Sequence, residues 1–211
     1  MVFTTSTYAE NAWWKGTLYL KNGKTLHGSL NFDSDNGSIR IKNKSQQLAF
    51  HSSKVKLFQF LDEELGVNRV FISSHAISNE KKMKHDFFEV IVSGAVCVLR
   101  TEQEVIQDRR PEFDKLNPQA VFVAPSEKYL VYKYNYYLSI DGDLMDYKKF
   151  DKDIYPKLLK AEPKLKGIIE SRKLDINEKQ DQFLIIRHFN KLQNNEQLPF
   201  LDQQNMNSDP M

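Results

Sequence analysis

The sequence has a single cysteine, no long apolar run and almost no net charge. Cys97 alone cannot form an intramolecular disulfide or complete a zinc site built from several cysteines. No run reaches the ~18 apolar residues that a membrane-spanning helix needs. Thirty Lys and Arg face 28 Asp and Glu, and a net charge of +2 supplies no general field that attracts nucleic acid. We therefore expect a globular protein with no transmembrane segment and no cofactor or metal, and nucleic acid is not the expected partner.

Catalytic motifs are also missing. The chain has no Gly-rich phosphate loop before a helix, no Gly-x-Ser-x-Gly and no His-Glu-x-x-His. Its five histidines are scattered along the chain: His27, His51, His75, His85 and His188. His85 with Asp86 is a candidate half of a metal or acid–base site, which His51 and His75 would join if the fold brought their loops together. Exposed loop histidines explain the spacing better, so the sequence assigns no enzyme activity and favours a non-catalytic protein.

Two further groups have structural explanations. Asp62, Glu63 and Glu64 are adjacent carboxylates, and a turn accounts for them without catalysis. Cys97 lies in the apolar run 95–99, which predicts a buried small hydrophobic side chain.

Between residues 17 and 60 the sequence has five short strand-like runs, at 17–20, 25–32, 38–42, 46–50 and 54–60. Asn22-Gly23 between two such runs predicts a two-residue hairpin in which both residues have positive φ. With Gly16 and Gly28 relieving the bends, the meander is expected to curl into a small SH3-like or Sm-like barrel.

The middle of the chain continues in the same way. Runs 68–73, 87–92 and 95–100 are expected as strands, with Ser93-Gly94 as a tight hairpin between the last two. Prolines at 111 and 118 favour an excursion with little regular structure over 101–120.

A tyrosine-rich strand is predicted over 128–140. Its even-numbered positions are mostly apolar and aromatic, and its odd-numbered positions, which include Tyr129, Lys133 and Tyr137, are more polar. A core strand is the ordinary explanation, and an aromatic platform for a ligand is the alternative. The candidate surface for a ligand or partner combines six residues: Tyr129, Tyr137, Lys133, His85, Lys81 and Lys82.

After Asp141-Gly142 the apolar spacing becomes helical, and three short helices are expected to pack on the sheet because they cannot bury their own apolar sides. The predicted fold class is α+β. The predicted organisation is a loose start or signal-peptide remnant (1–12), a β-rich domain (13–142), a helical subdomain (143–192) and a polar, disordered tail (193–211).

Several segments in order give a resemblance: 14–20, Asn22-Gly23, 26–28, 87–90 with Gly94, the tyrosine strand, and 185–190. In this order the chain resembles uncharacterised exported proteins of the bacteroidete type, for which no catalytic residues are known to us. The resemblance implies an envelope location. Thr7 and Ala9 look like the end of a signal peptide, although no full signal precedes them, and a cytoplasmic protein is the alternative.

Two functions therefore remain open from the sequence. One is a non-catalytic binding or scaffolding protein of the bacterial cell envelope, whose partner is another envelope protein or a small ligand. The other is a cytoplasmic Sm-like or SH3-like module that binds nucleic acid.

Overall fold

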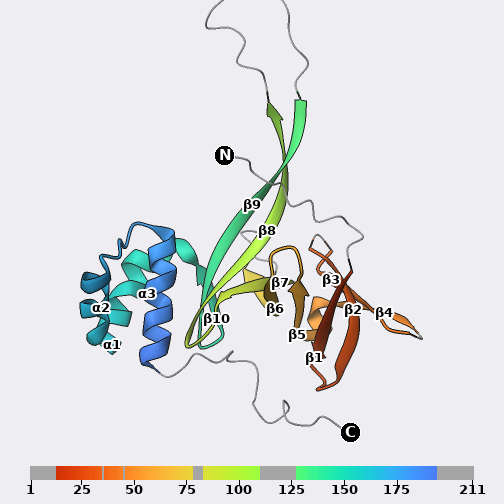
Figure 1. The fold of residues 1–211 in the computed structure, drawn as a ribbon, viewed down its shortest axis with the longest axis horizontal. Coiled ribbons are helices and arrows are strands. Elements are labelled where there is room, and N and C mark those ends of the chain that lie inside the picture. The colour runs from red at the N-terminus through yellow and green to blue at the C-terminus, as the bar shows by residue number, and fades with distance from the viewer. Residues whose placement is uncertain (1–12, 35, 45, 78–82, 110–126, 194–211) are drawn as a thin grey trace, which may run out of the picture. The chain divides into compact units, whose positions relative to one another are not determined.

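The computed structural model describes residues 13–34, 36–44, 46–77, 83–109 and 127–193, and it has the predicted α+β class (Figure 1). The described residues form a largely antiparallel sheet and three α-helices. The chain divides into two compact units. The first comprises Met1–Thr101 with Tyr136–Met211, and the second comprises Glu102–Asn135.

Ten strands are present in the described residues, and they form one sheet in the order β10-β9-β8-β7-β6-β5-β1-β2-β3-β4. In chain order they are β1 (Trp14–Leu20), β2 (Thr25–Asp33), β3 (Ser38–Lys42), β4 (Gln47–His51), β5 (Val55–Asp62), β6 (Val67–Ile77), β7 (Met83–Val92), β8 (Val96–Arg109), β9 (Glu127–Ile140) and β10 (Asp143–Asp146). A single 3-10 turn, η1 (Ser52–Lys54), connects β4 to β5.

The first hairpin differs in length from the prediction. Gly23 has φ +85°, as predicted, but Asn22 does not have positive φ. The Gly23 N–H donates to the Leu20 carbonyl (3.1 Å), and the Leu20 N–H donates to the Lys24 carbonyl (2.9 Å). The loop therefore has three residues, with glycine in the left-handed position that follows an ordinary turn. The prediction of a two-residue type I′ turn was wrong, because only Gly23 of the two residues adopts positive φ.

Strands β1 to β7 curl strongly. Gly16 and Gly28 are register partners between β1 and β2, and a Cβ on Gly16 would collide with the backbone carbonyl of Gln59. The ring of Phe32 in β2 lies 5.5 Å from that of Phe87 in β7, although three strands separate these two in the sheet. Nevertheless the sheet is open in the described residues, with β4 and β10 as its edges. The structure thus does not form the closed SH3-like or Sm-like barrel that the turn spacing suggested.

The concave side of this curl encloses the phenylalanine cluster, which we define by the stacked or edge-on rings of Phe58, Phe60, Phe71 and Phe87. We call the side of the sheet that carries these rings the phenylalanine face. The opposite face of the same strands buries a separate group that includes Leu57, Ile72, Phe88, Cys97 and Leu99.

Cys97 is buried, as predicted. Its exposed fraction is 2%, and its Sγ lies 3.2 Å from the carbonyl of Gly94. Burial raises the pKa of the Cys97 thiol, and the hydrogen bond to Gly94 opposes this effect. A raised pKa and low exposure both make the thiol unreactive.

The expected excursion after residue 100 was wrong for residues 101–109, which continue β8. This stretch contains no proline or glycine, and the prolines that suggested a loop lie further along the chain, at 111 and 118. The tyrosine strand is present as β9. Its end is buried on both sides, because Leu138 and Ser139 are both buried.

The chain after β10 is helical, as predicted. A 3-10 turn, η2 (Tyr147–Lys149), leads through a π-helical turn, η3 (Phe150–Ile154), into α1 (Tyr155–Ala161), which is followed by α2 (Lys164–Arg172) and α3 (Lys179–Leu192). Pro156 lies in the first turn of α1, where its missing N–H removes no helical hydrogen bond.

The helices pack on the sheet, as predicted. Ile185, Ile186 and Phe189 of α3 belong to one buried cluster with Val92, Val96 and Val98 of the sheet, and we call these six residues the helix-covered cluster. Asn190 of α3 reaches the turn between β7 and β8. Its Oδ1 accepts from the Val96 N–H (3.0 Å), and its Nδ2 donates to the carbonyls of Ser93 (2.9 Å) and Val96 (2.8 Å).

Among the described residues, no helix is both long enough and apolar enough to cross a bilayer.

Candidate functional site: a buried charge network

Four charged side chains lie across four neighbouring strands at one end of the phenylalanine cluster. We call them the charge network: Asp62 of β5, Arg69 of β6, Glu89 of β7 and Arg100 of β8. Arg69, Glu89 and Asp62 are buried, with exposed fractions of 6%, 7% and 4%, whereas Arg100 is partly exposed. Buried charges are rare unless they are paired, so this group is the most unusual polar feature of the described core.

Register explains why the four meet. Glu89 and Arg100 are directly opposite each other in the β7–β8 pair, and Phe60 is opposite Arg69 in the β5–β6 pair. Opposite residues of an antiparallel pair point to the same face, and so do residues two apart in one strand. All four side chains therefore share the phenylalanine face.

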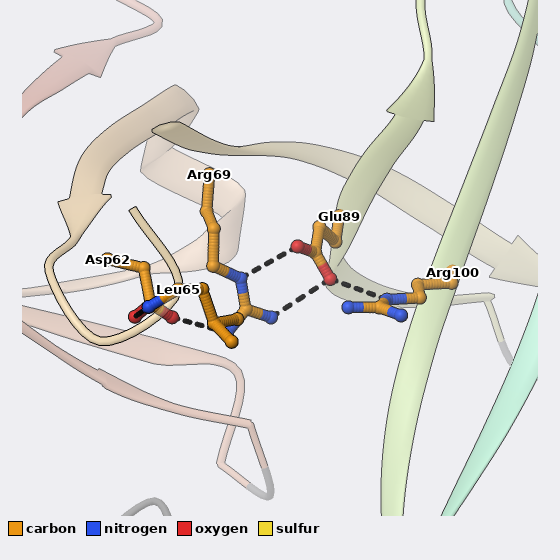
Figure 2. Close-up of polar contacts among 5 residues, drawn as sticks. All are labelled: Asp62, Leu65, Arg69, Glu89 and Arg100. Carbon is orange, nitrogen blue, oxygen red and sulfur yellow. Dashed lines mark hydrogen bonds and ion pairs between the residues drawn. The ribbon is translucent and has the colours of Figure 1, made fainter. Parts of the chain in front are cut away.

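Glu89 is the centre of the network (Figure 2). Its Oε1 accepts from Nε of Arg69 (2.7 Å), and its Oε2 accepts from Nη2 of Arg69 (2.9 Å) and from Nε of Arg100 (2.6 Å). The bond to Arg69 is bidentate, the geometry in which a guanidinium and a carboxylate fit best. Glu89 thus ties β6, β7 and β8 together through side chains.

Arg69 completes the network on its other side. Its Nη1 lies 3.7 Å from Oδ2 of Asp62, and its Cζ lies 5.1 Å from the centre of the Phe71 ring and 5.9 Å from that of Phe60. The aromatic faces attract the guanidinium and replace part of the hydration that it loses on burial. Asp62 in turn accepts from the Leu65 N–H through Oδ1 (3.1 Å), which fixes the turn after β5.

The chemistry that this arrangement allows is limited by its own pairing. Two carboxylates and two guanidiniums cancel in formal charge, and both oxygens of Glu89 already accept hydrogen bonds from arginine. A general base needs an oxygen directed at the proton it removes. The charge network is therefore better suited to holding the strands together than to acid–base chemistry.

The end of the β5–β6 hairpin lies beside the network and is apolar at its surface. Leu61, Leu65 and Val67 have exposed fractions of 50%, 59% and 48%. Among the described residues, half of the six large exposed hydrophobic side chains fall within this one seven-residue segment. Glu63 and Glu64 are exposed between them, so the hairpin end is both apolar and acidic.

The six residues predicted as a ligand surface have different positions. Tyr137 is half-buried, and its ring lies edge-on to Phe88 at 5.3 Å. Lys133 is exposed and belongs to the second unit. Tyr129 lies in β9 and His85 in β7, but their side chains are not described, and Lys81 and Lys82 fall outside the described residues. A surface formed by these six stays a prediction.

None of the five histidines lies in a loop, which contradicts the sequence expectation. His27, His51, His75 and His85 lie in β2, β4, β6 and β7, and His188 lies in α3. His75 and His85 are register partners between β6 and β7. His51, at the end of β4, also caps η1 by accepting from the Ser53 N–H (3.2 Å), and His27 contacts Thr17 Oγ1 (3.1 Å). Within the part of the chain whose side chains are described, no three His, Cys, Asp or Glu residues are placed to hold a metal ion.

Sequence reasoning missed the charge network and treated Asp62 as an exposed turn residue. A signal was present, because Asp62 is two residues from Phe60, Arg69 from Phe71, Glu89 from Phe87 and Arg100 from Val98. Each charge thus falls on an apolar side of its strand, and the signs alternate from strand to strand.

Comparison of the chain with protein-family models, with curated proteins and with solved structures gave no match.

Proposed function

We propose that this protein is a non-catalytic binding or scaffolding protein of the bacterial cell envelope, and that the β5–β6 hairpin end, Leu61 to Val67, contacts its partner. The observation that carries the proposal is the exposure of Leu61, Leu65 and Val67 in one short segment. Single exposed hydrophobic residues are ordinary, but a group of them marks an interaction site more often than chance.

The charge network supports the proposal because it fixes the hairpin end. Asp62 holds the Leu65 N–H on one side and the Arg69 guanidinium on the other. A loop held in one conformation loses little conformational entropy when it binds. The network thus pre-organises the hairpin end for a partner, and its balanced charges agree with a role that involves no catalysis.

The envelope location is part of the same proposal. It rests on the small residues Thr7 and Ala9 near the start and on the resemblance to exported proteins described above. A partner in the envelope would be another protein or a small ligand.

A photo-crosslinking amino acid at position 65 tests the proposal in intact bacterial cells. We expect a discrete adduct in the envelope fraction, because Leu65 is the most exposed apolar side chain of the hairpin end. The matched control carries the same group at Lys24, an exposed position in the β1–β2 turn. A crosslinker at position 61 in a Leu65→Ser background should give a weaker adduct. Equal adducts from positions 65 and 24, or a protein found only in the cytoplasm, would contradict the proposal.

The second candidate is a cytoplasmic module that binds nucleic acid, and the distribution of charge favours it. Residues 147–193 carry twelve Lys and Arg against seven Asp and Glu, a net charge of +5. The whole chain carries +2, so the remaining residues carry −3. All twelve basic side chains are exposed. The helical part is thus a local basic surface of the kind that neutralises phosphates.

Fluorescence anisotropy with a labelled single-stranded oligonucleotide separates the two candidates. Nucleic-acid binding predicts that affinity falls steeply with salt, because each phosphate contact releases counterions. Replacing Lys157, Lys160 and Lys164 by Glu should abolish that binding. The control replaces three other exposed lysines, Lys21, Lys24 and Lys56, and changes the net charge equally. No binding at low salt would exclude the second candidate.

A further inference from the structure

The two edges of the sheet differ in how they meet solvent. Strand β4 pairs with β3 along its whole length, from Gln47 opposite Lys42 to His51 opposite Ser38. On its other side, no strand of the described residues pairs with it. Such an edge presents backbone N–H and C=O groups that can pair with another strand.

The opposite edge, β10, carries a common protection. Asp143 and Asp146 stand at its two ends, and both are exposed. Charged side chains on an edge strand disfavour pairing, because they repel like charges on an incoming strand and would lose hydration against it. The five residues of β4 include no Lys, Arg, Asp, Glu, Pro or Gly, and the β3–β4 register runs without a bulge. Within the described part of the chain, β4 is therefore the edge that lacks this protection.

The side chains of β4 favour a particular partner. Leu48 and Phe50 pack against the buried core that includes the phenylalanine cluster, which leaves Gln47, Ala49 and His51 exposed on the outer side. In an antiparallel twofold pairing centred on Ala49, the two alanines meet at the axis and Gln47 of each copy faces His51 of the other. The centre is small and no like charges oppose each other within the strand, so the segment is complementary to itself.

From this geometry we propose that β4 pairs with β4 of a second copy of this chain, and that the sheets of two copies join into one through an antiparallel twofold contact. The proposal goes beyond the binding function above, because it needs no other partner. A strand of five residues buries less than the ~800 Å² per partner of a standard interface, so the association is weak and depends on concentration. It would place two hairpin ends in one assembly and so strengthen binding to a partner with repeated sites.

Sedimentation velocity of the full chain over a wide range of concentration tests the dimer. We expect the mean mass to rise toward that of two chains with increasing concentration. Ala49→Lys puts two like charges at the axis and should weaken association at least tenfold. The matched control is Thr25→Lys, which adds the same charge at an exposed position of β2 away from the edge, and should leave association unchanged. Circular dichroism of both variants checks that they remain folded.

Disulfide trapping tests whether the two β4 strands pair with Ala49 opposite Ala49. Ala49→Cys should form a disulfide-linked dimer with glutathione disulfide as oxidant, because directly opposite Cβ atoms lie about 4.5–5.5 Å apart. Thr25→Cys should not, and the buried Cys97 gives little background in either variant. A wild-type chain that stays monomeric at every concentration would overturn the proposal. So would a dimer that is unchanged by Ala49→Lys, since its contact would lie elsewhere.

Discussion

The phenylalanine cluster and the helix-covered cluster are assembled in different ways. The first is built from consecutive hairpins, and its rings come from strands β5, β6 and β7 within thirty residues: Phe58, Phe60, Phe71 and Phe87. The second joins Val92 and Val98 to Ile185, Ile186 and Phe189, which follow some ninety residues later. The comparison suggests that local sequence patterns are enough to build one core, whereas the other depends on contacts between distant segments.

Equal truncations in the two clusters should have unequal effects. Phe58 is fully buried, and its ring contacts Phe71 at 4.8 Å and Phe87 at 5.1 Å, so Phe58→Ala loses ring pairs as well as volume. We expect a loss of ~4–5 kcal/mol in the free energy of unfolding for Phe58→Ala and ~3 kcal/mol for Phe189→Ala. Urea denaturation of both variants measures the difference. Equal losses of free energy would show that the contacts between aromatic rings add no stability beyond the burial of apolar area.

Hydrogen exchange sharpens the same comparison. If the clusters unfold as separate cooperative units, Phe189→Ala should lower protection in α3 and leave β1 to β3 unchanged. Loss of protection everywhere would instead show that the two clusters unfold together.

The charge network adjoins both clusters. Glu89 lies two residues from Phe87 in β7, and its register partner Arg100 lies two residues from Val98 in β8. Glu89→Gln leaves two buried or partly buried guanidiniums without their shared anion. We expect a loss of about 3 kcal/mol in the free energy of unfolding. The control is Glu170→Gln, which removes an exposed pair with Lys166 at 3.9 Å and should cost about 0.3–0.5 kcal/mol. A neutral result for Glu89→Gln would mean that the network adds no stability over a neutral amide.

Asn190 ties the helix-covered cluster to the β7–β8 turn. Asn190→Ala leaves the Val96 N–H and the Ser93 and Val96 carbonyls without their described side-chain partner. We expect a loss on the order of 2 kcal/mol, since each unsatisfied buried group costs roughly 1–3 kcal/mol and solvent can reach part of the site. Exchange of the Val96 amide should accelerate more than that of amides in β1. The opposite order would contradict a local role for Asn190.

The smallest effect concerns His188 on α3. Partial burial lowers the pKa of His188, and the positive charges of Arg172 and Lys191 lower it further. In the unfolded chain the pKa of His188 has its ordinary value of ~6.5, so below that pH the unfolded chain binds the proton more readily than the folded chain. The free energy of unfolding is therefore unaffected by His188 above that pH and falls as the pH drops through it. His188→Gln should flatten this slope in thermal melts at several pH values. An imidazole titration midpoint at or above the ordinary value, measured by NMR, would contradict the sign.

Much of the sheet was predictable because its strands are short and bounded by turn residues. Gly23 is one example, since a positive φ was inferred there from sequence alone and is present. The tyrosine strand is another, because alternation over 128–140 identified it. These are local properties, in which the signal and its consequence lie within a few residues.

The charge network was not predictable in the same way, since it depends on pairing across four strands. Arg69 lies 20 residues from Glu89, and Glu89 lies 11 from Arg100. Whether a charged residue in a strand faces solvent or a partner depends on register, which alternation alone does not give. The open edge at β4 was missed for a related reason, because the meander was expected to close on itself.

One irregularity in β7 allows a single strand to serve both clusters. Val90 pairs with Leu99 and Val92 pairs with Val98, so Ile91 is an extra residue in the ladder. Simple alternation would place Val92 on the face opposite Phe87 and Glu89, and the bulge returns it to their face. A further residue inserted between Ile91 and Val92 would therefore turn Val92 away from the helices, although it would leave the composition of the core almost unchanged. Among descendants of this gene, single-residue insertions should accordingly be selected against between Ile91 and Val92.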